Sequence, residues 1–166
     1  MKRALFAVAT FLRDRYLAVD ARSLALFRVV FGLHLIVNLY DRTQGPDGVA
    51  FYTNEGMYPN HYALFNPLGD KNWSLLFPCS SPGEVQVALA CMFLVYLAYV
   101  VGFHTKVAQI LAVVCFLSLD NRNLILQNGG IVVTNLVAIW SAFLPLGARF
   151  SVDALLRSLR ERREST

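Results

Sequence analysis

The chain has 166 residues, of which 56% are hydrophobic and 16% carry a charge, and its mean hydropathy is +0.48. Soluble domains carry roughly 25% charged residues, so this composition argues against an ordinary water-soluble protein. The formal net charge of +4 indicates membrane lipid rather than nucleic acid as a partner, because the lysines and arginines stand at the ends of apolar runs, beside the head-group layer.

Residues 1–19 begin with a charged and apolar pattern that resembles a secretory signal peptide. The apolar part is short, runs into Arg13, Asp14 and Arg15, and lacks the small-residue cleavage site of such peptides. We therefore expect this segment to be retained as an amphipathic helix lying on the membrane surface.

Four long apolar runs follow, at residues 24–40, 85–103, 107–119 and 131–148. Each approaches or reaches the ~20 residues that carry a helix across ~30 Å of hydrocarbon. The predicted fold class is all-α: a polytopic membrane protein with a four-transmembrane-helix bundle in residues 20–153. Amphipathic interfacial helices are expected at both termini and in the first outer loop.

The first run is polar on one side. Arg28, His34, Asn38 and Asp41 fall within an arc of about 140° on a helix, and such a face should look into the bundle. A charge at this depth costs on the order of 3 kcal/mol, so these residues have either a structural partner or a function.

Two of these residues each have two open interpretations. Arg28 either reaches toward the near end of the helix and pairs with an acid such as Asp20 or Asp153, or belongs to a functional site. His34 lies deeper, and it either forms a hydrogen bond to a neighbouring helix or carries protons.

The segment 41–83 is rich in turn residues and aromatic rings. The rings are Phe51, Tyr52, Tyr58, Tyr62, Phe65, Trp73 and Phe77. Because such rings prefer the head-group layer, we expect one or two short helices along the interface. The rings form either an aromatic belt or a lid over a lipid-facing pocket.

Small residues align on one side of the second and fourth runs. They are Cys91, Ala98 and Gly102 in the second run and Thr134, Ala138 and Ser141 in the fourth. Aligned small residues let a neighbouring backbone approach closely, so we interpret them as helix-packing positions.

The cysteines and histidines predict neither a disulfide framework nor a metal site. The chain has three cysteines, Cys79, Cys91 and Cys115, and an odd number cannot all be paired in disulfides. Two of them lie in apolar runs, as small hydrophobic residues do. His34, His61 and His104 belong to different membrane depths and lack the spacing of a ligand set.

The densest polar patch lies between the third and fourth runs, at residues 120–123 and 127–130. A helix cap and turn use this composition without any further function. Four successive polar residues exceed what a turn requires, however, and we hypothesise an Asp41–Arg122 or Asp120–Arg42 ion pair at the outer mouth of the bundle. Catalytic residues stay unassigned, and the candidate polar cluster is Arg28, His34, Asn38, Asp41, Arg42, Asp120, Asn121, Arg122, Asn123 and Asn128.

The basic residues predict the orientation. Eleven of the 15 lysines and arginines lie on the side of the two termini, three lie on the other side, and Arg28 is inside the first run. The positive-inside rule then places a multi-pass protein in the plasma (inner) membrane with both termini cytoplasmic. Residues 154–166 are expected to form a basic helix on the cytoplasmic surface.

Six motifs between residues 20 and 155 resemble the HTTM (horizontally transferred transmembrane) domain family, in family order. They are 20–32 (DARSLALFRVVFG), 52–59 (YTNEGMYP), 102–108 (GFHTKVA), 118–123 (SLDNRN), 128–130 (NGG) and 143–153 (FLPLGARFSVD). The resemblance implies a helical membrane domain like that of vitamin K-dependent gamma-carboxylase, and it also suggests chemistry on a lipid-soluble quinone.

The resemblance does not carry the carboxylase activity over to this chain. The essential lysine of the carboxylase belongs to a later membrane segment that has no counterpart here, and Lys106 matches no catalytic motif. The chain is either a natural four-span form, which its basic tail favours, or the front part of a longer family member.

We expect a bacterial membrane module without an enzyme activity of its own, acting with itself or with another membrane protein. The alternative is a quinone- or isoprenoid-lipid-binding redox or carboxylase-like component. In that case quinone is the cofactor, and the head-group end is lined by His34, Asn38, Asp41, Asp120 and Arg122.

Overall fold

The computed structural model describes residues 20–164 except 45–47, 57, 66–72 and 124–127. Within these ranges the chain forms six α-helices, one 3-10 helix and no strand. The helices are α2 (Ala21–Thr43), η1 (Ala50–Tyr52), α3 (Asn60–Leu64), α4 (Pro82–Val101), α5 (Thr105–Arg122), α6 (Gly129–Ser141) and α7 (Val152–Glu164). The all-α fold class is confirmed, whereas the surface helix predicted for residues 1–19 lies outside the described residues.

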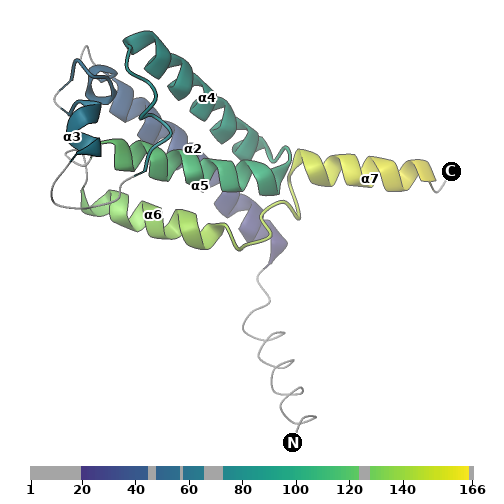
Figure 1. Ribbon diagram of the computed structural model, residues 1–166. Helices are drawn as coiled ribbons and strands as arrows, with labels where there is room; N and C mark the ends of the chain where they lie inside the picture. Colours follow the sequence, from purple (N-terminus) through teal and green to yellow (C-terminus); the bar gives the residue numbers. More distant parts are fainter. Residues whose placement is uncertain (1–19, 45–47, 57, 66–72, 124–127, 165–166) are drawn as a thin grey trace, which may run out of the picture.

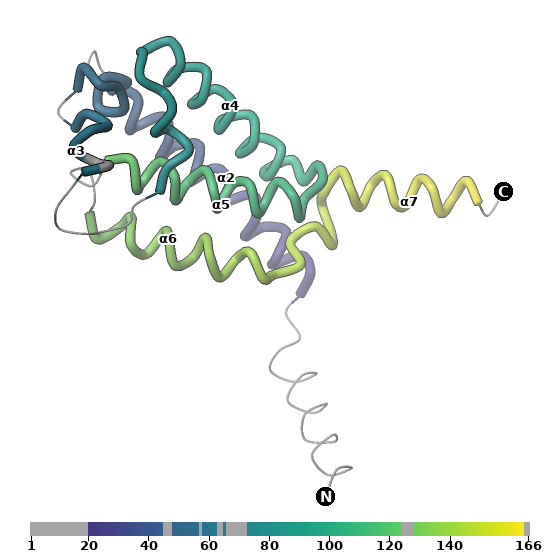
Figure 2. Tube along the Cα trace, in the orientation of Figure 1, coloured from purple at the N-terminus to yellow at the C-terminus, as the bar shows by residue number. Residues whose placement is uncertain are grey.

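Four helices form the body of the molecule. Helix α2 packs against α4, α4 against α5 and α5 against α6, with α3 at one end of this bundle and α7 projecting from the other (Figure 1). The chain leaves α6 through an irregular turn and enters α7 directed away from the bundle (Figure 2). We refer to the two extremities as the α3 end and the α7 end.

Local sequence signals explain where the helices start. Ser81 and Glu84 form a reciprocal capping box at the start of α4, with Pro82 in the first helical turn. The Asn128 side chain accepts a hydrogen bond from the Ile131 amide and so caps α6. Each cap satisfies amides that a helix start leaves open.

Helix α4 ends at Gly102, where the backbone φ is +77°. A Cβ atom added at this position would lie 2.5 Å from Ser151 Cβ and 2.8 Å from Arg28 Nη1. Both the left-handed backbone and the lack of space require glycine here. Three segments that are distant in sequence therefore meet at the end of α4.

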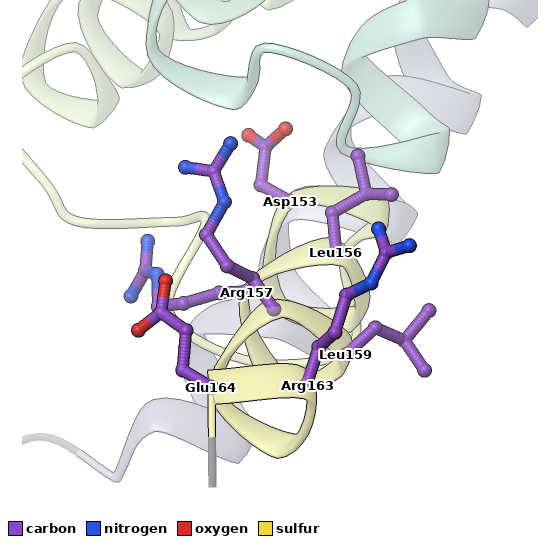
Figure 3. Close-up of a pocket in the computed structure, with 7 residues that line it drawn as sticks. Asp153, Leu156, Arg157, Leu159, Arg163 and Glu164 are labelled. Atoms are coloured by element: carbon purple, nitrogen blue, oxygen red, sulfur yellow. The ribbon is translucent and has the colours of Figure 1, made fainter. Parts of the chain in front are cut away.

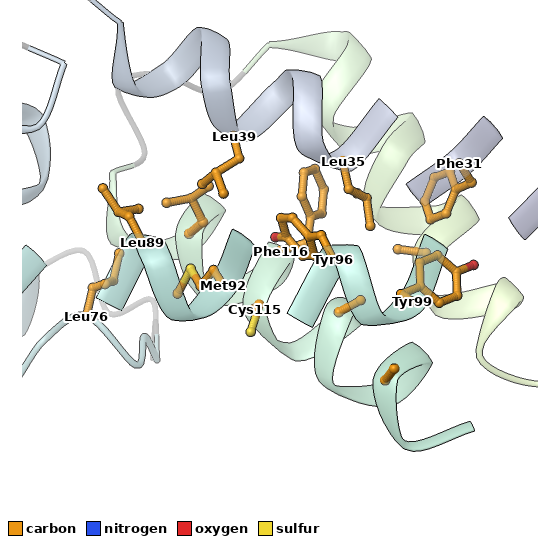
Figure 4. Close-up of a cluster of buried hydrophobic side chains, with 14 of the residues drawn as sticks. Phe31, Leu35, Leu39, Leu76, Leu89, Met92, Tyr96, Tyr99, Cys115 and Phe116 are labelled. Carbon is orange, nitrogen blue, oxygen red and sulfur yellow. The ribbon is translucent and has the colours of Figure 1, made fainter. Parts of the chain in front are cut away.

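An apolar core fills the space between α2, α4 and α5. Leu35, Tyr96 and Phe116 are each at most 1% exposed and come from these three helices (Figure 4). Toward the α3 end, Leu39, Leu89 and Leu76 continue the same cluster. This shared core holds α2, α4 and α5 against one another.

Two described helices, rather than the predicted four, are long and apolar enough to cross a membrane by length and composition: α2 with 23 residues and α4 with 20. Helix α5 has 18 residues but carries three charges. Lys106 lies in its first turn, and Asp120 and Arg122 lie in its last turn, because the polar patch expected in the following turn continues the helix. Helix α6 has 13 residues and ends at Ser141, before the end of the predicted run 131–148, so it spans only ~20 Å.

Candidate functional site

A buried ion pair joins the helices at the α3 end. The Arg42 guanidinium, in the last turn of α2, lies 3.5 Å from the Asp120 carboxylate of α5, and the two side chains are 8% and 3% exposed. Asn135 of α6 donates a hydrogen bond of 2.7 Å to the second carboxylate oxygen. One carboxylate therefore connects three helices.

This contact confirms one of the two hypothesised pairings, Asp120 with Arg42. The other pairing is not formed among the described residues, since Asp41 is exposed and Arg122 is buried against backbone carbonyls. The difference follows from helix geometry, because Asp41 and Arg42 are adjacent and point to different sides of α2.

Arg122 and Asn123 attach the loop segment between α2 and α4 to the end of α5. Arg122 donates to the carbonyls of Tyr58 at 2.8 Å and Thr53 at 3.4 Å, and Asn123 donates to that of Phe51 at 3.1 Å. The Arg122 guanidinium also lies 6.0 Å from the centre of the Phe77 ring. Two residues of the predicted polar patch thus fix the segment that covers this end of the bundle.

Several buried polar atoms around the ion pair lack a hydrogen-bond partner among the described residues. They include Oδ1 of Asn38, the hydroxyl of Tyr96 and Oδ1 of Asn135. Most buried polar atoms in proteins are bonded, so these three atoms can accept or donate a bond to water or to a polar ligand. Burial raises the pKa of Tyr52, which lies near the same cluster, and the neighbouring Arg42 guanidinium opposes that rise.

Arg28 lies at the opposite end of the bundle. Its guanidinium is fully buried and donates to the carbonyls of Leu146, at 3.0 Å, and Phe150. Among the described residues Arg28 forms no direct ion pair with Asp20 or Asp153, although the charge of Asp153 acts on it electrostatically. Asp20 caps the start of α2, and the Arg28 guanidinium bonds to carbonyls that the turn after α6 leaves open.

Asp153 has a different partner, which the sequence interpretation missed. Its carboxylate accepts hydrogen bonds from the amides of His104 at 2.9 Å and Thr105 at 2.6 Å, and from the Thr105 hydroxyl at 2.7 Å. Burial alone would raise the pKa of Asp153, but these hydrogen bonds hold it below its usual value. Asp153 thereby caps α5 from another helix.

The remaining members of the predicted cluster are dispersed. His34 Nε2 lies 3.2 Å from the Thr134 hydroxyl and links α2 to α6, which agrees with the structural interpretation of this histidine. Asn128 caps α6, and Asn121 is half-buried on α5. The structure thus brings Arg42, Asp120, Arg122 and Asn123 together and leaves Arg28 and His34 elsewhere.

The predicted helix-packing positions differ in how deeply they are buried. Gly102, Ala138 and Ser141 are buried inside the chain, Ala98 and Thr134 are half-buried, and Cys91 is exposed. Gln109, which the sequence interpretation did not single out, is 1% exposed and donates to the Ser141 carbonyl. In the described ranges no three His, Cys, Asp or Glu residues are placed to hold a metal ion.

These observations define a class: an all-α helix bundle with two helices of membrane-crossing length and a buried ion pair at one end. Comparison of the chain with protein-family models, with curated proteins and with solved structures finds no match. The resemblance to the HTTM domain therefore stays a prediction from the six motifs.

Removing the charge of Asp120 should destabilise the bundle far more than removing the charge of Asp41, the exposed residue next to Arg42 on α2. The Asp120→Asn change leaves Arg42 buried without its counter-ion, at a cost of about 3 kcal/mol or more. Asp41→Asn, at an exposed position, should change stability by less than about 0.5 kcal/mol. Thermal unfolding of both variants in detergent checks the difference, and equal melting temperatures would contradict the structural role of the pair.

Proposed function

We propose that the chain is an integral membrane protein whose four-helix body lies in the lipid. The observation that carries this proposal is a reversed distribution of polarity. Leu26, Val87 and Trp140 are 65%, 66% and 70% exposed, whereas Arg28 and Arg122 are fully buried. In water such apolar faces would be costly, but in hydrocarbon they are the favourable surface, and buried charges must bond within the protein.

Helices α5 and α6 accompany the two longer helices through the membrane in this proposal. The charges of α5 stand at its two ends, so residues 107–119 provide an apolar middle. Lys106 reaches the Ala142 carbonyl at the end of α6, and Asp120 is paired at the other end. Helix α6 is short, and beyond its end the chain runs on toward the head-group layer, where Phe143 is 76% exposed.

The α7 end faces the cytoplasm in our proposal, and the α3 end faces outward. The charge asymmetry supports this orientation, since the arginines of α7 and Lys106 lie at one end of the bundle. The start of α2, the end of α4 and the start of α5 gather at that same end through Arg28, Gly102 and Asp153.

Cysteine labelling of intact cells tests this placement. In a Cys79→Ser background, an impermeant maleimide should label Ser80→Cys, an exposed position before α4, and should label Ser158→Cys on α7 only after lysis. The reversed pattern would overturn the orientation. Release of the protein from membranes at alkaline pH would contradict the membrane assignment itself.

Within the membrane we propose that the chain acts as a module that associates with a second copy or with another membrane protein. Helix α4 supports this role, because one side of it contacts neither α2 nor α5. Val87, Cys91, Leu94 and Val101 are exposed there at spacings of four, three and seven residues. Such spacing forms the seam of paired helices.

If two copies meet along this seam, mild oxidation in native membranes should give a disulfide-linked dimer through Cys91. The Cys91→Ser variant should lose the dimer, and Cys91→Ser with Leu94→Cys should restore it. A matched control is Cys91→Ser with Leu33→Cys, which places a thiol on the exposed side of α2. Equal dimer yields at positions 33 and 94 would indicate random collision and contradict the seam.

A second candidate function is the binding of a quinone or other isoprenoid lipid. A groove of about 460 Å³ runs between α2 and α4 near the α3 end, lined by Ile36, Tyr40, Gln86 and Phe93 among others. Leu39 and Leu89 line it too, and they belong to the core that includes Tyr52 and Tyr96. The groove has the apolar lining that an isoprenoid chain requires.

Lipid extraction distinguishes the two candidates. A quinone-binding protein purified in mild detergent should retain the quinone in near-stoichiometric amount, and Leu89→Trp should lower that amount several-fold by filling the groove. Val87→Trp, on the opposite exposed side of α4, serves as the control and should leave it unchanged. Equal quinone content in both variants, or none in the unmodified protein, would set this function aside.

A further inference from the structure

Helix α7 stands apart from the bundle with no buried residue. Its apolar side chains Leu155, Leu156 and Leu159 are more than half exposed. On a helical projection they occupy an arc of about 100°, and Arg157 and Arg160 follow beside that arc. An apolar strip flanked by arginines matches the boundary between lipid chains and anionic head groups.

Two hollows are lined by residues of α7, and the smaller one lies at the joint between α7 and the bundle. The larger, of about 730 Å³, follows α7 and is lined by Asp153, Leu156, Arg157, Leu159, Arg160, Arg163 and Glu164 (Figure 3). The smaller, of about 340 Å³, lies between the start of α5, the turn after α6 and α7, and its lining includes Lys106, Gly147 and Arg157. Asp153 and Arg157 line both hollows, so the two lie next to each other.

The charges around this joint are mainly positive. Lys106, Arg157, Arg160 and Arg163 contribute four cations, against the carboxylates of Asp153 and Glu164. The Asp153 carboxylate is occupied by the amides and hydroxyl at the start of α5. The side chains of the four cations are exposed, which suits a negatively charged ligand. Lys106 donates one hydrogen bond to the Ala142 carbonyl, and its ammonium group has two further N–H donors for such a ligand.

We propose that this joint binds the phosphate head group of an anionic phospholipid, with Lys106 and Arg157 contacting the phosphate and Arg160 and Arg163 extending the contact along α7. This inference rests on the proposed membrane placement of the bundle. Basic hollows beside membrane helices on the cytoplasmic side are suited to such head groups.

The lining of the larger hollow favours a lipid over a free phosphate ion. Leu156 and Leu159 lie in the same wall as Arg157 and Arg160. A free ion gains nothing from these leucines, whereas a phospholipid buries them against its glycerol and first methylene groups. Binding would also lay α7 on the surface of the bilayer, because the head group contacts α5 and α7 together.

The test uses the full chain in nanodiscs of phosphatidylcholine, with and without added phosphatidylglycerol, and measures amide hydrogen exchange in α7. Phosphatidylglycerol should slow this exchange. Arg157→Gln should raise the phosphatidylglycerol fraction needed for half-protection about fivefold, the ratio that corresponds to ~1 kcal/mol per basic residue. The matched control is Arg162→Gln, which removes the same charge from α7 outside both hollows and should shift the midpoint less than about twofold.

Three outcomes would overturn the proposal. They are equal exchange in the two lipid compositions, equal shifts for the two variants, and equal protection by inorganic phosphate in phosphatidylcholine nanodiscs. Melting temperatures in phosphatidylcholine nanodiscs verify that both variants are folded. Failure of the unmodified chain to enter nanodiscs would count against the membrane placement, whereas entry without a lipid preference would count against this inference alone.

Discussion

A charged side chain that is buried among apolar helices must find its partners inside the protein, and this requirement organises both ends of the bundle. At the α3 end Asp120 pairs with Arg42 and accepts a hydrogen bond from Asn135, and Arg122 donates to backbone carbonyls of the covering loop segment. At the α7 end Arg28 donates hydrogen bonds to two backbone carbonyls of the turn after α6. The cost of an unpartnered charge in such surroundings is several kcal/mol, so each contact also selects which segments can lie beside one another.

Both ends of the bundle keep buried polar atoms that have no hydrogen-bond partner among the described residues. At the α3 end they belong to Asn38, Tyr96 and Asn135, and at the α7 end to Arg28, Tyr99 and Gln109. The α7 end adds a row of exposed arginines, Arg157, Arg160 and Arg163, on the surface of α7. The proposed functions follow this difference: an apolar groove for an isoprenoid chain at the α3 end, and a phospholipid head group at the α7 end.

The sequence predicts those features that depend on local pattern. Helical content, a helix cap in the turn before α6 and an ion pair between the ends of α2 and α5 follow from periodicity, turn chemistry and charge. The choice of Asp120–Arg42 over Asp41–Arg122 came only from the structure. The carbonyl partners of Arg28 and the capping of α5 by Asp153 depend on a turn whose path no single helix pattern defines. Of the described helices, only α2 and α4 have the length and composition of a membrane-crossing helix, for a related reason. The polar residues 120–122 belong to α5 itself and not to the turn after it, because their side chains find partners on other segments.

The contact between Arg28 and the Leu146 carbonyl spans 118 positions along the chain. During synthesis at about 5–20 residues per second, α2 precedes this partner by roughly 6–24 s. If the first helix enters the bilayer in the order of its translation, its guanidinium waits for that interval in the insertion machinery or at the lipid surface. The turn after α6, which is translated after all four helices of the body, would then fix the position of the first of them.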